Sequence, residues 1–231
     1  MSPGKQHSFL IMNMENTYPL AGLRESGKNQ IFGATVCACV VVPDSEALRR
    51  LSDVVVDRAD RLSDSALWAL DPIIRREARV FCFVPSMSVY NAQVAKMRGD
   101  QLAIVGWLYA HALSEAMHTG PVERVSLKKF SRLDTITPAL SRLDISAPEE
   151  FFIERTGRQM ETLVEAASVC ARVAYMNQLR ALEDCVDSSL CLGYGQDWGD
   201  LAQAIYDKYG AAALCRVARE HAPIIRRILG R

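Results

Sequence analysis

A strongly apolar run at residues 31–42, closed by Pro43, constrains the fold of this chain more than any other feature. Its least interrupted part, residues 34–42, is far shorter than the roughly 20 residues that span a bilayer, and its valines favour a buried strand. A shorter apolar piece at residues 19–23 precedes it across the turn-rich residues 25–29, so the sequence predicts two strands joined by a loop. No charged and then apolar signal segment opens the chain, and we expect a soluble, cytoplasmic protein with no membrane partner.

Strand-like and helix-like patterns alternate further along the chain. Apolar residues recur at helical spacing within residues 44–78, 89–97 and 102–117, and the short apolar piece at 80–84 is typical of a buried strand. Two more strands are predicted at 122–130 and 151–153, with a loop at 134–148 between them. The chain is predicted to be helical at 161–182, 197–209 and 211–229. This order predicts an α/β fold with helices massed at the C-terminal end.

Length and composition favour one domain with a sizeable core. The polar residues 1–17 are predicted to form a flexible N-terminal segment, followed by a single domain at 18–231. The chain has 27 Lys and Arg against 27 Asp and Glu, which excludes a globally basic nucleic-acid-binding protein, so any nucleic-acid groove must be a local patch. Seven cysteines, mostly within apolar runs, favour a reducing compartment over a disulfide framework.

Five stretches, in the same order along the chain, resemble signatures of the bacterial ribonuclease HII and HIII family. The Ala-rich residues 163–172 resemble the family's A-V-A-A-A-S-I-I-A-R helix, and residues 32–38 resemble its F-G-P-V-V-V-A strand. Residues 107–113 are similar to W-L-H-A-R-A-L of the type HIII enzymes, and residues 208–210 and 217–221 to the K-Y-G and V-A-K-L-H signatures. The resemblance implies a ribonuclease H-like mixed β-sheet flanked by helices, with a helical C-terminal region.

The resemblance also implies hydrolysis of RNA in RNA/DNA hybrids by two metal ions, held by four carboxylates. In the family's first motif, G-x-D-E-x-G-x-G, this chain keeps the second acid as Glu25 but carries Arg24 in place of the first. Lys128 stands where L-I-D-Q-F has its acid, and Arg158 where K-A-E has its acid. Because arginine and lysine remove a ligand and repel a divalent cation, we expect no metal cofactor and a vestigial Glu25. A register shift of one helical turn would instead place Glu154, Glu161 or Glu165 at the fourth position.

Cations at these positions would suit a phosphate better than a metal ion. Gly27 is kept from the family's glycine loop, which lets backbone groups approach the ribose 2′-hydroxyl, whereas Asn29 replaces the second glycine. Arg58 and Arg61 partly replace the family's phosphate-contacting D-S-K-K-L segment. The predicted nucleic-acid-binding residues are Arg24, Gly27, Lys28, Asn29, Arg58, Arg61, Lys128 and Arg158.

Three other groups of residues have two interpretations each. The C-terminal part of the chain is rich in arginine, at positions 216, 219, 226, 227 and 231. These arginines form either a basic surface that binds nucleic acid or an acidic protein, or simply a solvated helix face. His111 and His118 share a helix face, but no acidic or cysteine partner lies nearby in the sequence to favour a metal site. The three tryptophans are expected to pack in the core rather than to stack on bases.

Three functional hypotheses follow. The first is a catalytically degenerate ribonuclease HIII-like subunit of a larger assembly, which binds an RNA/DNA hybrid or a single strand, or scaffolds a protein partner. The second is an active metal-dependent endoribonuclease, in which magnesium or manganese is held by Glu25 with Asp134, Asp144, Glu154 or Glu161. The third is a fold kept for protein interaction alone. Charge reversal at three expected ligand positions favours the first hypothesis.

Overall fold

The computed structural model describes residues 18–55, 58–127, 133–148, 150–153, 158–190 and 197–231. The prediction of a flexible segment at residues 1–17 concerns residues outside these ranges. None of the helices in the described ranges has the length and apolar character that would let it cross a membrane.

Five strands form one mixed sheet in the order β3-β2-β1-β4-β5. The central strand β1 is antiparallel to β2 and parallel to β4, while β3 and β5 extend the two sides as antiparallel and parallel neighbours. This arrangement confirms the predicted α/β fold with a mixed sheet. The strands are β1 (Leu20–Ser26), β2 (Val36–Val42), β3 (Arg79–Phe83), β4 (Arg124–Leu127) and β5 (Glu150–Ile153).

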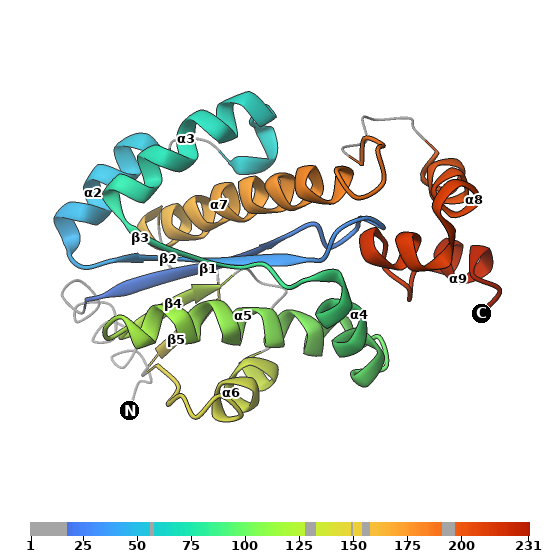
Figure 1. The fold of residues 1–231 in the computed structure, drawn as a ribbon. Helices are drawn as coiled ribbons and strands as arrows, with labels where there is room; N and C mark the ends of the chain where they lie inside the picture. The colour runs from blue at the N-terminus through green and yellow to red at the C-terminus, as the bar shows by residue number, and fades with distance from the viewer. Residues whose placement is uncertain (1–17, 56–57, 128–132, 149, 154–157, 191–196) are drawn as a thin grey trace, which may run out of the picture.

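Helices cover both faces of this sheet, and α8 and α9 lie together at one end, next to the C-terminus (Figure 1). One face carries α2 (Ser45–Val54), α3 (Asp64–Glu77) and α7 (Arg158–Glu183). The other face carries α4 (Met87–Lys96), α5 (Gln101–His118) and α6 (Leu133–Ser141). The remaining elements are the 3₁₀ turn η1 (Ala59–Arg61), α8 (Trp198–Val217) and α9 (Pro223–Ile228).

The continuous apolar run of the sequence is explained by burial of β2 on both faces. All seven residues of β2 are buried. Val36, Ala38 and Val40 pack in the hydrophobic cluster beneath α7, whereas Cys37 and Cys39 pack in the cluster beneath α5. A strand buried on both faces has no polar positions to alternate with its apolar ones.

A glycine of β1, Gly22, lets α7 lie directly on the strand. A Cβ atom added to Gly22 would lie 2.4 Å from the backbone carbonyl carbon of Leu163, so only glycine fits at this crossing. Further along, Gly27 lies against the ring of Tyr175. The helix α7 therefore runs in the same direction as β1. Both elements lead from the crossing at Gly22 toward the end of the sheet where the candidate site lies.

The structure differs from the predicted elements in three places. The predicted loop at 134–148 is wrong over its first part, because α6 buries Ile136, Ala139 and Leu140, and this packing overrides the loop propensity of its Thr and Pro residues. The strand predicted from residue 31 begins at residue 36. The helix predicted at 211–229 is interrupted, since residues 218–222 separate α8 from α9 and Ala218 pairs with Phe32 in a β-bridge.

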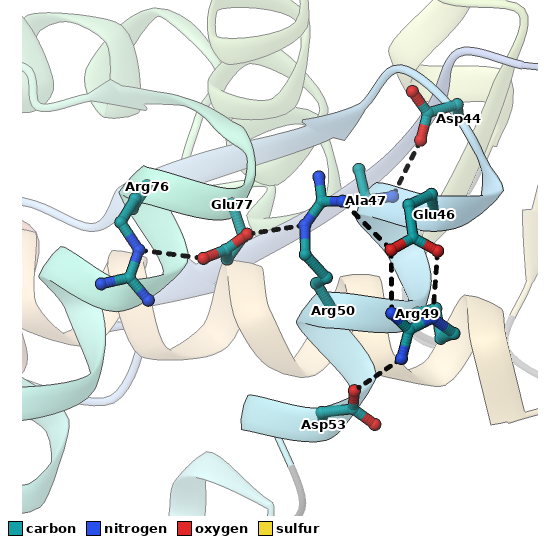
Figure 2. Close-up of polar contacts among 8 residues, drawn as sticks. All are labelled: Asp44, Glu46, Ala47, Arg49, Arg50, Asp53, Arg76 and Glu77. Atoms are coloured by element: carbon teal, nitrogen blue, oxygen red, sulfur yellow. Dashed lines mark hydrogen bonds and ion pairs between the residues drawn. The ribbon is translucent and has the colours of Figure 1, made fainter.

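An exposed ion-pair network joins α2 to α3 (Figure 2). Glu77 on α3 accepts hydrogen bonds from Arg50 and Arg76, each at 2.9 Å. On α2, Arg49 binds Glu46 at 2.8 Å and Asp53 at 3.2 Å. These solvated pairs add little stability, but they show that the arginines on this surface are matched by carboxylates.

Candidate nucleic-acid interface

The candidate site is built on the C-terminal end of the central strand. Ala21 and Leu23 point into the cluster beneath α5, and Gly22 faces α7, so β1 alternates between the two faces of the sheet. Pairing of β1 with β4 ends at Leu23 within the described residues, whereas pairing with β2 continues to Ser26. The polar residues Arg24, Glu25 and Ser26 thus form the C-terminal end of β1, where they pair with Ala38, Cys37 and Val36 of β2.

Glu25 and Arg24 have different surroundings. The Glu25 carboxylate accepts a hydrogen bond from the hydroxyl of Tyr109, a fully buried residue of α5. Strand alternation directs the half-buried Arg24 toward the α7 face instead. Its guanidinium has no hydrogen-bond or ion-pair partner among the residues that the structure describes. The two side chains therefore do not neutralise each other, and no carboxylate of the described ranges balances the charge of Arg24.

The loop that follows, residues 27–33, is bound to the protein by a residue far away in the sequence. Arg219 donates from Nη2 to Gly27 O at 2.6 Å, from Nη1 to Lys28 O at 2.9 Å, and from Nε to Gly33 O at 2.7 Å. Arg219 is 2% exposed. It therefore cannot belong to a basic surface, which corrects that interpretation of the C-terminal arginines for this residue.

Gly27 begins the loop with a φ of +81°, a left-handed conformation that glycine adopts at low cost. Lys28 and the exposed Asn29 follow it at the tip, and neither side chain has a partner within the described chain. The structure thus brings four predicted residues, Arg24, Gly27, Lys28 and Asn29, to one end of the sheet.

Arg58 and Arg61 lie at a second place along α7. The Glu165 carboxylate accepts the N–H of Ala59 at 2.9 Å and so attaches η1 to α7. Arg58 pairs with Asp60 at 2.9 Å, and Arg61 is exposed. Ten residues of helix, about 15 Å, separate Glu165 from Tyr175, which contacts the 27–33 loop. The two predicted basic groups therefore lie at separate points along α7 and do not form one continuous cluster.

Part of the predicted acidic and basic set lies outside the described part of the chain. Lys128 and Glu154 lie outside the described residues, as do the side chains of Arg158 and Asp134. Glu161 is exposed in the first turn of α7, before the crossing at Gly22, whereas Glu25 lies three residues beyond that crossing. Strand and helix rises put them about 13 Å apart along the sheet, so the structure does not bring Glu161 to Glu25.

The described carboxylates do not fit a divalent metal centre. Within these residues, no three His, Cys, Asp or Glu side chains lie close enough together to hold an ion. Glu165 is bound to a backbone N–H, Asp144 is exposed in the turn after α6, and Glu25 is bound by Tyr109. A hard cation needs several oxygen ligands, and the side chains described around Glu25 do not supply them.

The histidines and tryptophans have structural surroundings. His111 stacks on Phe83 with ring centroids 4.4 Å apart, and burial lowers its pKa. His118 Nδ1 lies 2.7 Å from the Ser114 carbonyl oxygen. Trp107 is buried and Trp198 stacks on Phe32, as expected for packing residues. Neither histidine therefore supports a metal site.

Three residues of this region were not predicted in their roles: Tyr109 and Tyr175 were not singled out, and Arg219 was named only among the C-terminal arginines. Each lies within a stretch that matches a family signature or follows one, yet nothing in the local pattern indicates which loop or carboxylate it contacts. The contacts join residues 84, 143 and 186 to 192 positions apart. Only an alignment with co-varying pairs carries that kind of signal.

Comparisons with known proteins agree with this architecture. The family model of ribonuclease HII matches residues 21–222. Ribonuclease HIII of Chlamydia muridarum is 26% identical over 239 aligned positions, which cover 100% of this chain and 76% of the relative, and that of Chlamydia pneumoniae is 23% identical over 96% of this chain and 74% of the relative.

Solved structures show the same fold. Bst-RNase HIII in complex with Mn²⁺ superposes with a TM-score of 0.80 at 22% identity, covering 97% of this chain and 73% of that chain. RNase HII from Archaeoglobus fulgidus, in its complex with PCNA, gives a TM-score of 0.62 at 18% identity, covering 89% and 96%. By sequence and by fold, this chain belongs to the ribonuclease HII and HIII family.

Proposed function

We propose that this chain is a catalytically degenerate ribonuclease HIII-like protein that binds nucleic acid, acting in the cytoplasm as a binding or scaffolding subunit of a larger assembly. One observation carries the proposal. At the end of β1, where the family motif has two adjacent acids, the chain has Arg24, which has no ion-pair partner among the described residues, followed by a glutamate that is bound by Tyr109.

Loss of hydrolysis follows from the charges at this strand end. Arginine stays protonated at any physiological pH, so Arg24 repels a divalent cation where the motif acid would attract one. Within the described residues no group of three His, Cys, Asp or Glu side chains could hold a metal ion, and Glu25 by itself offers too few oxygen ligands for one. One oxygen of the remaining carboxylate accepts a hydrogen bond from the Tyr109 hydroxyl, which gives Glu25 a structural contact.

Binding of phosphate follows from the same residues. The arginines of α2 that Figure 2 shows are matched by Glu46, Asp53 and Glu77. Arg24 and Lys28 have no such match within the described chain. When such cations neutralise phosphates, the counterions condensed on the nucleic acid are released, and this release favours binding.

The proposed ligand is an RNA/DNA hybrid, which is the nucleic acid that the family binds, or a single strand. The PCNA complex of the Archaeoglobus relative is a precedent for a protein partner in this family, and it supports the scaffolding part of the proposal.

Binding is tested by measuring the affinity of the purified chain for a fluorescent RNA/DNA hybrid over a range of salt concentrations. We expect Arg24→Gln and Lys28→Gln each to weaken binding and to lower the slope of log K against log salt by about 1. Arg49→Gln is the matched control, because Arg49 is exposed but paired with two carboxylates. Equal effects of all three variants, or no binding at low salt, would contradict the proposal and favour a purely protein-binding role.

The alternative function is an active metal-dependent nuclease that cleaves RNA in hybrids. Family membership and the retained Glu25 favour it, and the crystal structure of Bst-RNase HIII with Mn²⁺ shows that a relative binds the metal. It requires additional ligands, for which the candidates are Asp134, Asp144, Glu154 and Glu161. It predicts metal-dependent cleavage that Glu25→Gln abolishes.

A further inference from the structure

Arg219 lies in the segment between α8 and α9 and is among the largest fully buried side chains of the described structure. Burying a charge is costly unless it is compensated. No carboxylate of the described chain forms an ion pair with it. Its compensation comes from the carbonyl oxygens of Gly27, Lys28 and Gly33, which accept all three of its nitrogen donors.

The other carbonyl groups of the second half of the loop also point into the protein. The backbone N–H of Arg219 donates to Ile31 O at 2.8 Å, and the Tyr175 hydroxyl donates to Phe32 O at 2.8 Å. The Gly33 N–H donates to Val217 O at 2.9 Å. Five of the seven loop carbonyls are therefore bound from the interior, four of them by Arg219.

This arrangement fixes the direction of the amide groups at the loop tip. In a trans peptide the C=O and N–H groups point in opposite directions. Because Arg219 binds the carbonyls of Gly27 and Lys28, the N–H groups of Lys28 and Asn29 in the same two peptide units point away from it. Neither N–H has a hydrogen-bond partner within the described chain. Two adjacent outward N–H groups form a concavity that suits an anion.

We propose that Arg219 is the positioning residue of this loop: it turns the Lys28 and Asn29 amides outward so that they bind a backbone phosphate of nucleic acid. The inference rests on the proposed nucleic-acid binding. Arg219 itself touches no phosphate, because its side chain is buried behind the loop. A positively charged residue thus acts on affinity through geometry and not through its own charge on the ligand.

The test compares Arg219→Lys with Tyr175→Phe in hybrid binding at several salt concentrations. Lysine keeps the charge but has one nitrogen in place of the three-nitrogen fork, so it cannot bind three separate carbonyls. Tyr175→Phe is the matched control, because it also removes a buried hydrogen bond to the loop, at Phe32 O, but leaves the Gly27 and Lys28 carbonyls bound. Thermal unfolding of both variants shows that they are folded at the assay temperature.

We expect Arg219→Lys to weaken hybrid binding about tenfold or more, as for the loss of roughly one hydrogen bond to a charged group, with an unchanged salt slope. Tyr175→Phe is expected to bind within about twofold of the wild type. Wild-type affinity in Arg219→Lys overturns the inference. So does a salt slope lowered by about 1, since that result would make Arg219 a direct phosphate contact.

Amide resonances separate this inference from the proposed function and cover the case in which Arg219→Lys does not fold. In the wild-type chain, NMR is expected to show Lys28 and Asn29 amide resonances that shift when hybrid is added, while the Arg219 Nε–H resonance remains protected and unshifted. If the wild type binds no hybrid, the proposed function fails. If it binds and these two amides do not shift, the positioning role fails alone.

Discussion

Replacement of Gly27 by alanine tests the packing of the 27–33 loop on α7. A Cβ atom at this position would lie 2.5 Å from Cε2 and 2.6 Å from Cδ2 of Tyr175, about 1 Å closer than ordinary van der Waals contact. The φ of +81° adds a second cost, because a side chain in the left-handed region is strained. Gly27→Ala therefore combines backbone strain with overpacking.

The two costs can be separated by a matched control. Gly99 has a φ of +74°, and an added Cβ there would meet nothing within 4 Å. We expect Gly99→Ala to lower the free energy of unfolding by about 1–2 kcal/mol, the left-handed cost alone. Gly27→Ala adds an overpacking cost of about 1–3 kcal/mol and is expected to lose about 2–5 kcal/mol in total.

Urea unfolding followed by tryptophan fluorescence measures both values. In a Tyr175→Ala background the ring is absent, so the further cost of Gly27→Ala is expected to fall to about 1–2 kcal/mol, as in the control. Equal losses in Gly27→Ala and Gly99→Ala, or no coupling between positions 27 and 175, would refute the close contact between the loop and α7.

Three further predictions concern stability. Burial lowers the pKa of His111 below 6.5, so the folded state favours the neutral ring. The contribution of His111 to the free energy of unfolding is therefore fully present above pH 6.5 and is lost as the pH falls toward the pKa of the folded state. His111→Phe is expected to flatten this part of the pH profile of stability, measured by urea unfolding. Tyr90→Phe is expected to cost about 1–3 kcal/mol, because the buried Thr35 hydroxyl, 3.0 Å from Tyr90 Oη, loses its partner; adding Thr35→Val should recover part of the loss. Arg49→Gln is expected to change the free energy of unfolding by less than about 1 kcal/mol, since its ion pairs are exposed, and a larger change in Tm would contradict this.

The regular elements of this fold could be predicted from the sequence because each leaves a local pattern. The doubly buried β2 has a continuous apolar run, and α7 carries an Ala-rich stretch that begins beside its crossing with Gly22. The helix α6 could not be predicted, because its Thr and Pro residues favour a loop and only packing against α5 makes it a helix. The local sequence pattern therefore predicts the sheet and the long helices, but it does not predict short elements that depend on tertiary contacts.

The candidate site was predictable only in part, for the same physical reason. The motif at residues 22–29 marks the strand end that carries Arg24 and Glu25, since its residues are adjacent in the chain. The contact of Tyr109 with Glu25 and the role of Arg219 depend on long-range contacts, and the sequence pattern made Arg219 a surface residue by its charge alone. Arg219 can be buried because three backbone carbonyl groups accept hydrogen bonds from its guanidinium, and no sequence motif indicates these bonds.

The central claim, that this family member binds nucleic acid without cleaving it, is tested most directly by incubating the purified chain with a labelled RNA/DNA hybrid and magnesium or manganese. Glu25→Gln is assayed beside it, and Arg24→Asp/Lys128→Asp serves as a restoration variant. We expect the wild type and Glu25→Gln both to bind the hybrid and to leave it intact. Metal-dependent cleavage by the wild type that is lost in Glu25→Gln would contradict this claim and establish a rebuilt active site.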